Sequence, residues 1–293
     1  MNFKVLGNCQ AGGIADSLEI LSNGSSVSGI LVSNEPKVLF SELSEHFFDS
    51  ESVLLLHDSV REIFSVNDSL AKFDRKENIY IPTISFAAFH PDIQYGFIDG
   101  AVVKSGLDSD WNSRIMLWAY SKGLSQGETE NLFREDVFQS LGYFDEWDKS
   151  SETLRKSFEE CGFDYGRWIR SVQRTGVFMY GINHPMQIGL SQLAVQIAER
   201  VFPNSHVVIE DLHTFTTDYL SHIVWPVYPE IGDHLGVEGS YHWRVARKHA
   251  SLTEFIELCF SAWDKMKLRK QKVNFIPVIS NEDDQLLRSL AGI

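Results

Sequence analysis

The chain has 293 residues, of which 43% are hydrophobic and 23% charged, a composition typical of a globular protein. Its formal net charge of −14 argues against nucleic-acid binding, because contact with a polyphosphate backbone requires a basic surface. No stretch approaches the roughly 18 apolar residues of a membrane-spanning helix, so none is expected. The three cysteines form no CxxC pair, which predicts no disulfide framework and no bound metal, and a cytoplasmic location with reduced thiols.

The first 90 residues alternate between short apolar runs and helical patterns. Strands are expected at residues 3–6, 27–32, 53–56 and 79–81, and helices at residues 11–21, 36–48 and 63–73. Apolar strands separated by helices are typical of a parallel sheet that is covered on both faces. This part of the chain therefore predicts an α/β fold.

The middle of the chain changes to helical patterns with few strand signals. Helices are expected at residues 112–122, with Asp110 as the cap, and at 126–141, 149–161 and 165–174. A strand at 177–180, a helix at 186–201, a strand at 206–209 and a helix at 252–266 follow. We therefore predict an α/β fold with a mostly parallel sheet and a large helical insertion. The predicted division is an α/β core (1–105 and 176–250), a helical insertion (106–175) and a C-terminal helix and tail (251–293).

A glycine-rich turn follows the first predicted strand. Gly7 permits a tight turn, and Asn8, Cys9 and Gln10 lead directly into the first helix. Ligands of parallel α/β proteins bind at the carboxyl ends of strands. At a helix N-terminus the pKa of a thiol is lowered, so we expect Cys9 to be a nucleophile and the Asn8 or Gln10 amide to hold an oxyanion. The alternative is a buried, inert cysteine beside a turn.

A second motif, Asn183-His184-Pro185, stands just before a long predicted helix. His184 is a candidate general base, and Asn183 a candidate binding residue. The segment resembles the last block of SGNH hydrolases, in which a His-Pro pair precedes a helix and the nucleophile follows the first strand. This resemblance implies that the mostly parallel sheet is part of a three-layer fold of SGNH or flavodoxin type. Two positions depart from that pattern: Cys9 replaces the usual serine, and Gly181 stands where the aspartate is expected.

Two further segments carry candidate ligand-binding residues. His90 and Asp92 follow the fourth predicted strand, where either can orient His184 or contact a substrate, or can simply build a turn. Tyr241, Trp243 and Arg244 combine aromatic rings with a cation, which suits stacking on an adenine or sugar ring. A plain aromatic-rich loop is the alternative for this second segment.

Taken together, the Gly7-Asn8-Cys9-Gln10 turn, the segment around His90 and Asp92 and the Asn183-His184-Pro185 segment resemble the WcbI-type polysaccharide-biosynthesis acetyltransferases. The resemblance runs from residue 1 to about residue 245. It implies an enzyme that uses acetyl coenzyme A to O-acetylate a saccharide of a capsular or other surface polysaccharide, in the cytoplasm. It also makes Cys9 and His184 the leading catalytic candidates.

Two mechanisms fit these residues. In the first, the Cys9 thiolate takes the acetyl group and passes it to a sugar hydroxyl; in the second, His184 deprotonates the hydroxyl for direct attack. Two other functions are open, a Cys/His esterase or thioesterase and a non-catalytic saccharide- or nucleotide-binding protein. The phosphates of coenzyme A require a local cation, for which Lys104, Arg114 and Arg244 are the candidates.

Overall fold

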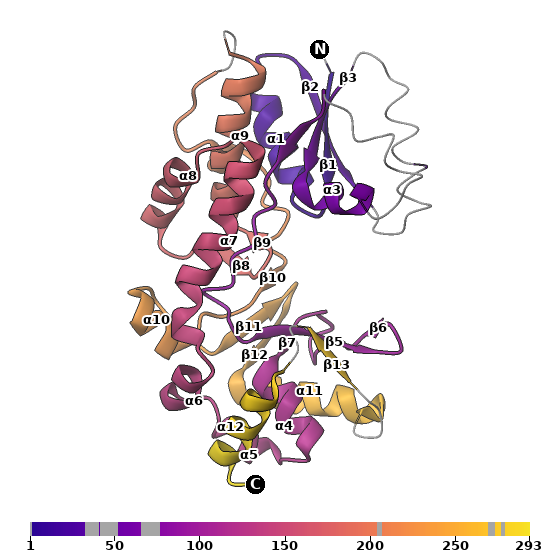
Figure 1. Ribbon diagram of the computed structural model, residues 1–293, viewed down its shortest axis with the longest axis vertical. Coiled ribbons are helices and arrows are strands. Elements are labelled where there is room, and N and C mark those ends of the chain that lie inside the picture. Colours follow the sequence, from indigo (N-terminus) through magenta and orange to yellow (C-terminus); the bar gives the residue numbers. More distant parts are fainter. Residues whose placement is uncertain are drawn as a thin grey trace. The chain divides into compact units, whose positions relative to one another are not determined.

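The computed structural model describes residues 2–32, 41, 52–65, 77–203, 207–268, 273–276 and 279–293. The chain forms two compact units (Figure 1). Unit 1 comprises Met1–Ser85, Ser151–Met179 and Asn183–Ser221, and unit 2 comprises Phe86–Ser150, Tyr180–Ile182 and His222–Ile293. The chain therefore passes between the units five times, and the predicted insertion at 106–175 contributes residues to both.

Unit 1 is built on a parallel sheet of four strands in the order β2-β1-β3-β4. The strands are β1 (Asn2–Gly7), β2 (Ser26–Leu31), β3 (Ser52–His57) and β4 (Ile79–Ile81). In the central strands Val5, Leu6, Leu55 and Leu56 are fully buried, as expected for a sheet covered on both faces. The predicted parallel α/β fold and its first four strands are confirmed.

A fifth strand was expected at residues 206–209, and this prediction is wrong for the described residues 207–209. The amide of Val207 donates a hydrogen bond to the Leu21 carbonyl (3.0 Å), but Val208 is 82% exposed and the segment adds no strand to the sheet. The segment does contain consecutive apolar residues, but it packs at the C-terminal end of the first helix rather than in a sheet. The predicted helix at 36–48 lies outside the described residues except for residue 41.

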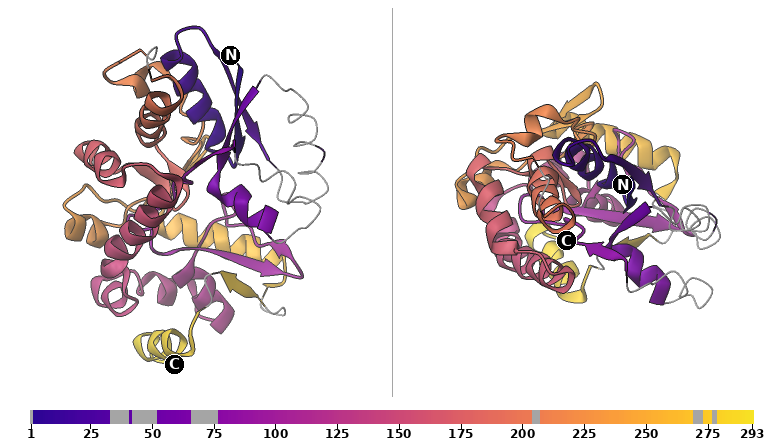
Figure 2. Two further views of the ribbon diagram at one scale, coloured as in Figure 1. Left: turned by 45° about the horizontal axis from the view of Figure 1, so that its top comes forward. Right: turned by 90° about the horizontal axis from the view of Figure 1, so that it is seen from above.

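Two helices of unit 1, α1 (Ala11–Leu21) and α9 (Gln187–Val201), lie side by side (Figures 1 and 2). Their interface is narrow because Gly13 has no side chain: a Cβ there would lie 2.5 Å from the Gln187 Oε1 atom. Gln187 Nε2 donates to the Gly13 carbonyl (2.9 Å), and the hydroxyls of Ser17 and Ser191 lie 3.0 Å apart. Small and polar residues thus fix α1 against α9.

Other helices of the chain follow the predicted pattern with shifted ends, except that of the helix predicted at 63–73 only residues 63–65, in α3, are among the described residues. They are α3 (Asp58–Ser65) and α8 (Tyr165–Val172) in unit 1, α4 (Arg114–Lys122), α5 (Gln126–Glu130) and α6 (Glu135–Ser140) in unit 2, and α7 (Glu146–Cys161), which contributes to both. Ser113, not Asp110, caps α4 by accepting the Met116 amide. The helix predicted at 126–141 is two helices, because residues 131–134 form a turn. The described residues also form 3₁₀ helices at Tyr143–Asp145, Gln173–Thr175 and Leu212–Phe215.

Unit 2 contains antiparallel sheets that the sequence did not predict. One has the order β10-β11-β12, and the other has the order β13-β5-β6 with β7 also paired to β5. Their bounds are β5 (Ile93–Ile98), β6 (Ala101–Val102), β7 (Asn112–Ser113), β10 (Ile223–Val224), β11 (His242–Val245), β12 (Lys248–Ser251) and β13 (Asn274–Ile276). Strands this short show little periodicity in the sequence.

The remaining elements complete the two units. They are the helices α10 (Pro229–Leu235), α11 (Leu252–Lys265) and α12 (Asn281–Ala291), and the short strands β8 (Met179–Gly181) and β9 (His184–Pro185). The predicted C-terminal helix at 252–266 is confirmed as α11. Across the described ranges, no helix is long and apolar enough to cross a membrane.

Candidate functional site

The Cys9 turn lies at the carboxyl end of β1, directly before α1. The Asn8 side chain builds the turn, because its Oδ1 atom accepts a hydrogen bond from the Gln10 amide (3.0 Å). The Asn8 carbonyl accepts a second one from the Ala11 amide (3.0 Å). Asparagine favours such turns because its side chain can bond the backbone two residues ahead. Cys9 is held half-buried between these bonds.

Gly7 is required at this turn by His57, a residue that the sequence analysis did not single out. A Cβ on Gly7 would lie 2.3 Å from the His57 Cγ atom, so the imidazole ring packs directly on the Gly7 backbone. His57 is fully buried at the end of β3, and burial lowers its pKa to about 4. The ring is therefore neutral at neutral pH and acts as an apolar support for the turn.

Gln10 connects the Cys9 turn to two distant segments. Its fully buried side chain donates from Nε2 to the carbonyls of Ile84 (2.7 Å) and Asn183 (3.0 Å). Its Oε1 atom accepts a hydrogen bond from the Ile84 amide (3.0 Å). Both amide donors are committed to the protein, so Gln10 does not provide the oxyanion donor that was expected of it. Its role is to position the turn.

His184 lies in β9, next to the residue that Gln10 binds. Its side chain is 9% exposed, and the α9 helix begins three residues later. The backbone carbonyl of Asn183 accepts a hydrogen bond from Gln10. Because Gln10 directly follows Cys9 and Asn183 directly precedes His184, this bond joins the neighbours of the two catalytic candidates. The structure thus brings the turns of the two leading catalytic candidates together within unit 1.

The Cys9 thiol differs from the sequence-based expectation. Burial raises the pKa of Cys9, although a backbone hydrogen bond opposes the shift. The predicted lowering of this pKa is therefore wrong, because loss of hydration outweighs the backbone hydrogen bond. Among the described residues, the Asn8 Nδ2 group has no hydrogen-bond acceptor, which leaves it as the side-chain amide donor beside Cys9.

Asp218 and Tyr219 contact the first turns of α9 and α1. The Asp218 Oδ2 atom accepts a hydrogen bond from the Gln187 amide (3.3 Å) at the start of α9. The Tyr219 ring lies 3.5 Å from a Cβ position on Gly12, in the first turn of α1, and is 49% exposed. One short segment therefore contacts the first turns of the two helices that follow Cys9 and His184.

The other predicted site residues belong to unit 2, where His90 and Asp92 are buried. The fully buried Asp92 carboxylate accepts hydrogen bonds from the hydroxyls of Tyr143 (2.8 Å) and Tyr228 (2.7 Å) and from the Ile115 amide (3.1 Å). Burial raises the pKa of Asp92. The His90 Nδ1 atom lies 3.3 Å from the Pro226 carbonyl oxygen. Both side chains support the core of unit 2 and are closed to a substrate, contrary to expectation.

The aromatic segment at 241–244 divides into core and surface. Trp243 is 1% exposed and stacks on Phe255 with ring centroids 4.5 Å apart, so it cannot stack on a ligand as expected. Tyr241 is half-buried and donates its hydroxyl to Glu230 (2.7 Å). Arg244 is half-buried on β11. The segment therefore serves mainly the packing of unit 2.

Two of the three cations considered for the phosphates of coenzyme A are neutralised by carboxylates. Lys104 pairs with Asp110 (2.5 Å), and Arg114 pairs with Asp283. In unit 1, the Arg61 guanidinium lies over the Tyr80 ring, 3.8 Å from its centroid, and forms no ion pair with a described residue. Arg61 is on α3, which leaves the carboxyl end of β3. Unlike Lys104 and Arg114, Arg61 is therefore not neutralised by a carboxylate of a described residue.

The fold and these contacts define an α/β protein with a cysteine and a histidine supported at the carboxyl edge of a parallel sheet. The family model for the polysaccharide biosynthesis enzyme WcbI matches residues 2–205. The chain thus belongs to the WcbI family of polysaccharide biosynthesis enzymes.

Comparison with solved structures supports the same fold. A WcbI polysaccharide-biosynthesis enzyme superposes with a TM-score of 0.65 at 11% sequence identity, over 99% of this chain and 94% of that chain. That protein is described as the native form without a disulfide bond between coenzyme A and one of its cysteines. No curated protein matches the chain.

Proposed function

We propose that this chain is a coenzyme-A-dependent O-acetyltransferase that modifies a saccharide in the cytoplasm, during biosynthesis of a capsular or other surface polysaccharide. The observation that carries the proposal is the junction through Gln10, which holds the Cys9 turn and the His184 segment together. The structural neighbour adds support, because its description names coenzyme A and a cysteine, with no disulfide bond between them in that structure. We assign Cys9 the corresponding place beside the thioester.

In the proposed reaction, His184 acts as the general base. A ring nitrogen of His184 takes the proton of a sugar hydroxyl while the hydroxyl oxygen attacks the acetyl carbonyl carbon. The Asn8 Nδ2 group donates to the carbonyl oxygen as negative charge develops on it. The carbon–sulfur bond of the thioester then breaks, and the departing thiolate of coenzyme A takes the proton back from His184.

The raised pKa of Cys9 favours this direct route over an acetyl-cysteine intermediate. A nucleophilic cysteine requires the thiolate, and burial keeps the Cys9 thiol protonated at neutral pH. Direct transfer requires no charge on Cys9, which then only shapes the floor of the site. Arg61 supplies a cation for the phosphates of coenzyme A in a chain whose formal net charge is −14.

The proposal is tested first by calorimetric titration of the full chain with coenzyme A. Saturable binding in the micromolar to low-millimolar range is expected, and a folded protein that shows no binding contradicts the proposal. Acetyl transfer is then measured with a panel of sugars, using wild-type protein and His184→Ala. Hydrolysis of acetyl coenzyme A at the same rate with and without any sugar would instead identify a thioesterase.

A further inference from the structure

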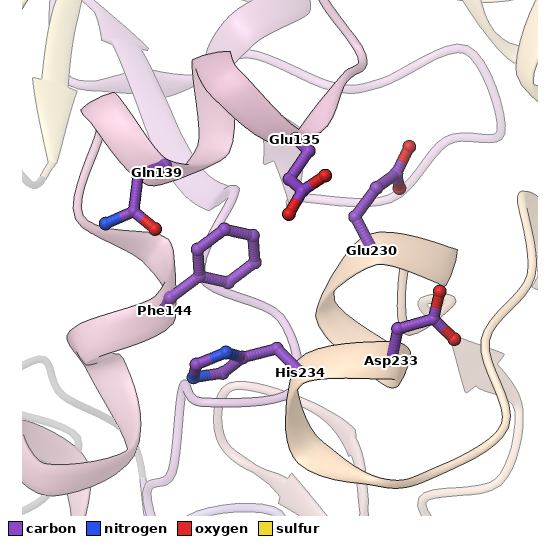
Figure 3. A pocket seen from close by; sticks show the side chains of 6 residues that line it. All are labelled: Glu135, Gln139, Phe144, Glu230, Asp233 and His234. Atoms are coloured by element: carbon purple, nitrogen blue, oxygen red, sulfur yellow. The ribbon is translucent and has the colours of Figure 1, made fainter.

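Unit 2 carries a pocket of about 300 Å³ that has no part in the proposed acetyl transfer (Figure 3). It lies between α6, the 3₁₀ helix Tyr143–Asp145 and α10. Its lining residues are Glu135, Gln139, Phe144, Glu230, Asp233 and His234. This volume is at the lower end of the range of small-molecule sites, which suits a ligand of about the size of one sugar ring.

One wall of the pocket is aromatic. The rings of Phe144 and His234 lie with their centroids 4.7 Å apart and their planes inclined by 30°. Phe144 is half-buried, so part of its ring faces the pocket, where Figure 3 shows it beside Glu135 and Gln139. A flat apolar ring of this kind packs against the carbon face of a sugar and also attracts a cation.

The rest of the lining consists of three carboxylates and the neutral Gln139 amide. Glu135 and Glu230 reach into the same opening from α6 and α10, and Asp233 stands one turn further along α10 (Figure 3). Both glutamates lie in the first turn of their helices, where the helix dipole favours the charged carboxylate. The Tyr241 hydroxyl donates to Glu230 (2.7 Å) and fixes its orientation. No lysine or arginine lines the pocket.

We propose that this pocket binds an amino sugar, with the protonated amine held by Glu135 and Glu230 and the ring packed on Phe144. An ammonium group donates hydrogen bonds to carboxylates, and its positive charge compensates their negative charge. The Gln139 amide, which both donates and accepts, suits sugar hydroxyls. The site is independent of Cys9 and His184 and goes beyond the proposed acetyl transfer.

The experiment titrates the full chain with glucosamine, with glucose, N-acetylglucosamine and putrescine as comparisons, by calorimetry at low salt. Glucosamine is expected to bind saturably and at least about tenfold more tightly than glucose or N-acetylglucosamine, which lack the charge. Putrescine, which lacks the ring, is expected to bind more weakly than glucosamine. Added salt weakens glucosamine binding because the interaction is electrostatic.

Two neighbouring acids provide a matched pair of variants. Glu135→Gln and Asp136→Asn each remove one charge from the first turn of α6, but only Glu135 lines the pocket. Glu135→Gln is expected to weaken glucosamine binding about fivefold or more, and Asp136→Asn less than about twofold. Phe144→Ala is expected to weaken glucosamine binding more than putrescine binding, because putrescine has no sugar ring to pack on Phe144.

Several outcomes overturn the proposal: no binding of glucosamine, equal binding of glucosamine and N-acetylglucosamine or putrescine, or equal effects of the two acidic variants. The test requires no enzymatic activity. Failure of coenzyme A to bind therefore does not affect it, and its own failure does not touch the proposed acetyl transfer.

Discussion

The side-chain amide of Gln10 donates a hydrogen bond to the carbonyl oxygen of Asn183, across 173 positions of sequence (3.0 Å). Through this bond the turn that carries Cys9 is fixed to the segment that carries His184. A catalytic pair must be held to within a fraction of an ångström, and residues that support the pair can matter as much as the reacting groups. Gln10 thus has a positioning role in the proposed site.

Replacing Gln10 by alanine is expected to reduce acetyl transfer at least about tenfold and to lower the free energy of unfolding by about 1–3 kcal/mol, since buried backbone groups lose their partners. Gln196 is a matched control in the same unit, because its buried side chain likewise bonds both the amide and the carbonyl of one residue, Asp164. Gln196→Ala is expected to cost similar stability with little loss of activity. Urea denaturation and single-turnover assays measure the two effects, and equal activity of the two variants would contradict the positioning role.

The Cys9 thiol is expected to react slowly with iodoacetamide at neutral pH and faster as the pH rises beyond the usual thiol range of about 8.5, because burial raises its pKa. Cys161 and Cys259 give little background, because burial raises the pKa of each to about 12. Mass spectrometry of the labelled peptides measures each site. Fast labelling of Cys9 at neutral pH, or loss of turnover in Cys9→Ala, would instead favour the covalent route.

His57 makes the stability of the fold sensitive to acid. Its pKa is about 4 in the folded protein and about 6.5 when unfolded, so the unfolded state takes up a proton first as the pH falls. Stability from this residue is full above about pH 6.5 and is lost progressively down to about pH 4, by on the order of 3 kcal/mol.

The check is urea denaturation across this pH window for wild-type protein and His57→Phe, which keeps a flat ring against Gly7 but cannot take a proton. The difference between the two proteins should grow as the pH falls. The exposed His249, replaced by glutamine, is the control and should leave the pH dependence unchanged. A parallel pH dependence in His57→Phe and wild type would refute the assignment.

Tyr219 is expected to contact the acyl donor, because its half-exposed ring covers Gly12 in the first turn after Cys9. Tyr219→Ala should weaken coenzyme A binding about threefold to tenfold, by loss of ring contact of about 1 kcal/mol. Phe215, which is 67% exposed and lies four residues earlier, is the matched control, and Phe215→Ala should bind as wild type does. Calorimetric titration decides, and equal affinities for the two variants would exclude this contact.

Periodicity predicted the parallel sheet and α1 because their apolar residues are buried in regular patterns. It did not predict the antiparallel strands of unit 2, which have two to six residues and depend on pairing between distant segments. Periodicity also wrongly predicted a strand at residues 207–209, where an apolar segment bonds to Leu21 at the end of α1 instead of joining the sheet. An apolar segment becomes a strand only where another strand pairs with it, and the sequence pattern does not show that pairing.

The candidate site was predicted in part. The residue types around Cys9 and His184 pointed to a common site, and the structure brings their turns together through Gln10. The role of Gln10, the support from His57 and the contact of Tyr219 with Gly12 depend on residues far apart in the sequence. The direction of the Cys9 pKa shift depends on burial, which local sequence does not measure.

The interleaving of the two units sets the order in which the protein can form. α9 completes the packing of α1 through Gln187 and Gly13, which are 174 residues apart. At ribosomal rates of about 5–20 residues per second, α1 waits roughly 10–35 seconds for its partner, with its apolar face open. Neither unit can be produced as one continuous fragment, so truncation at any single point leaves at least one of them unfinished. We therefore expect the yield of folded protein to depend on how well chaperones protect the incomplete chain during synthesis, more than on the free energy of unfolding of the finished protein.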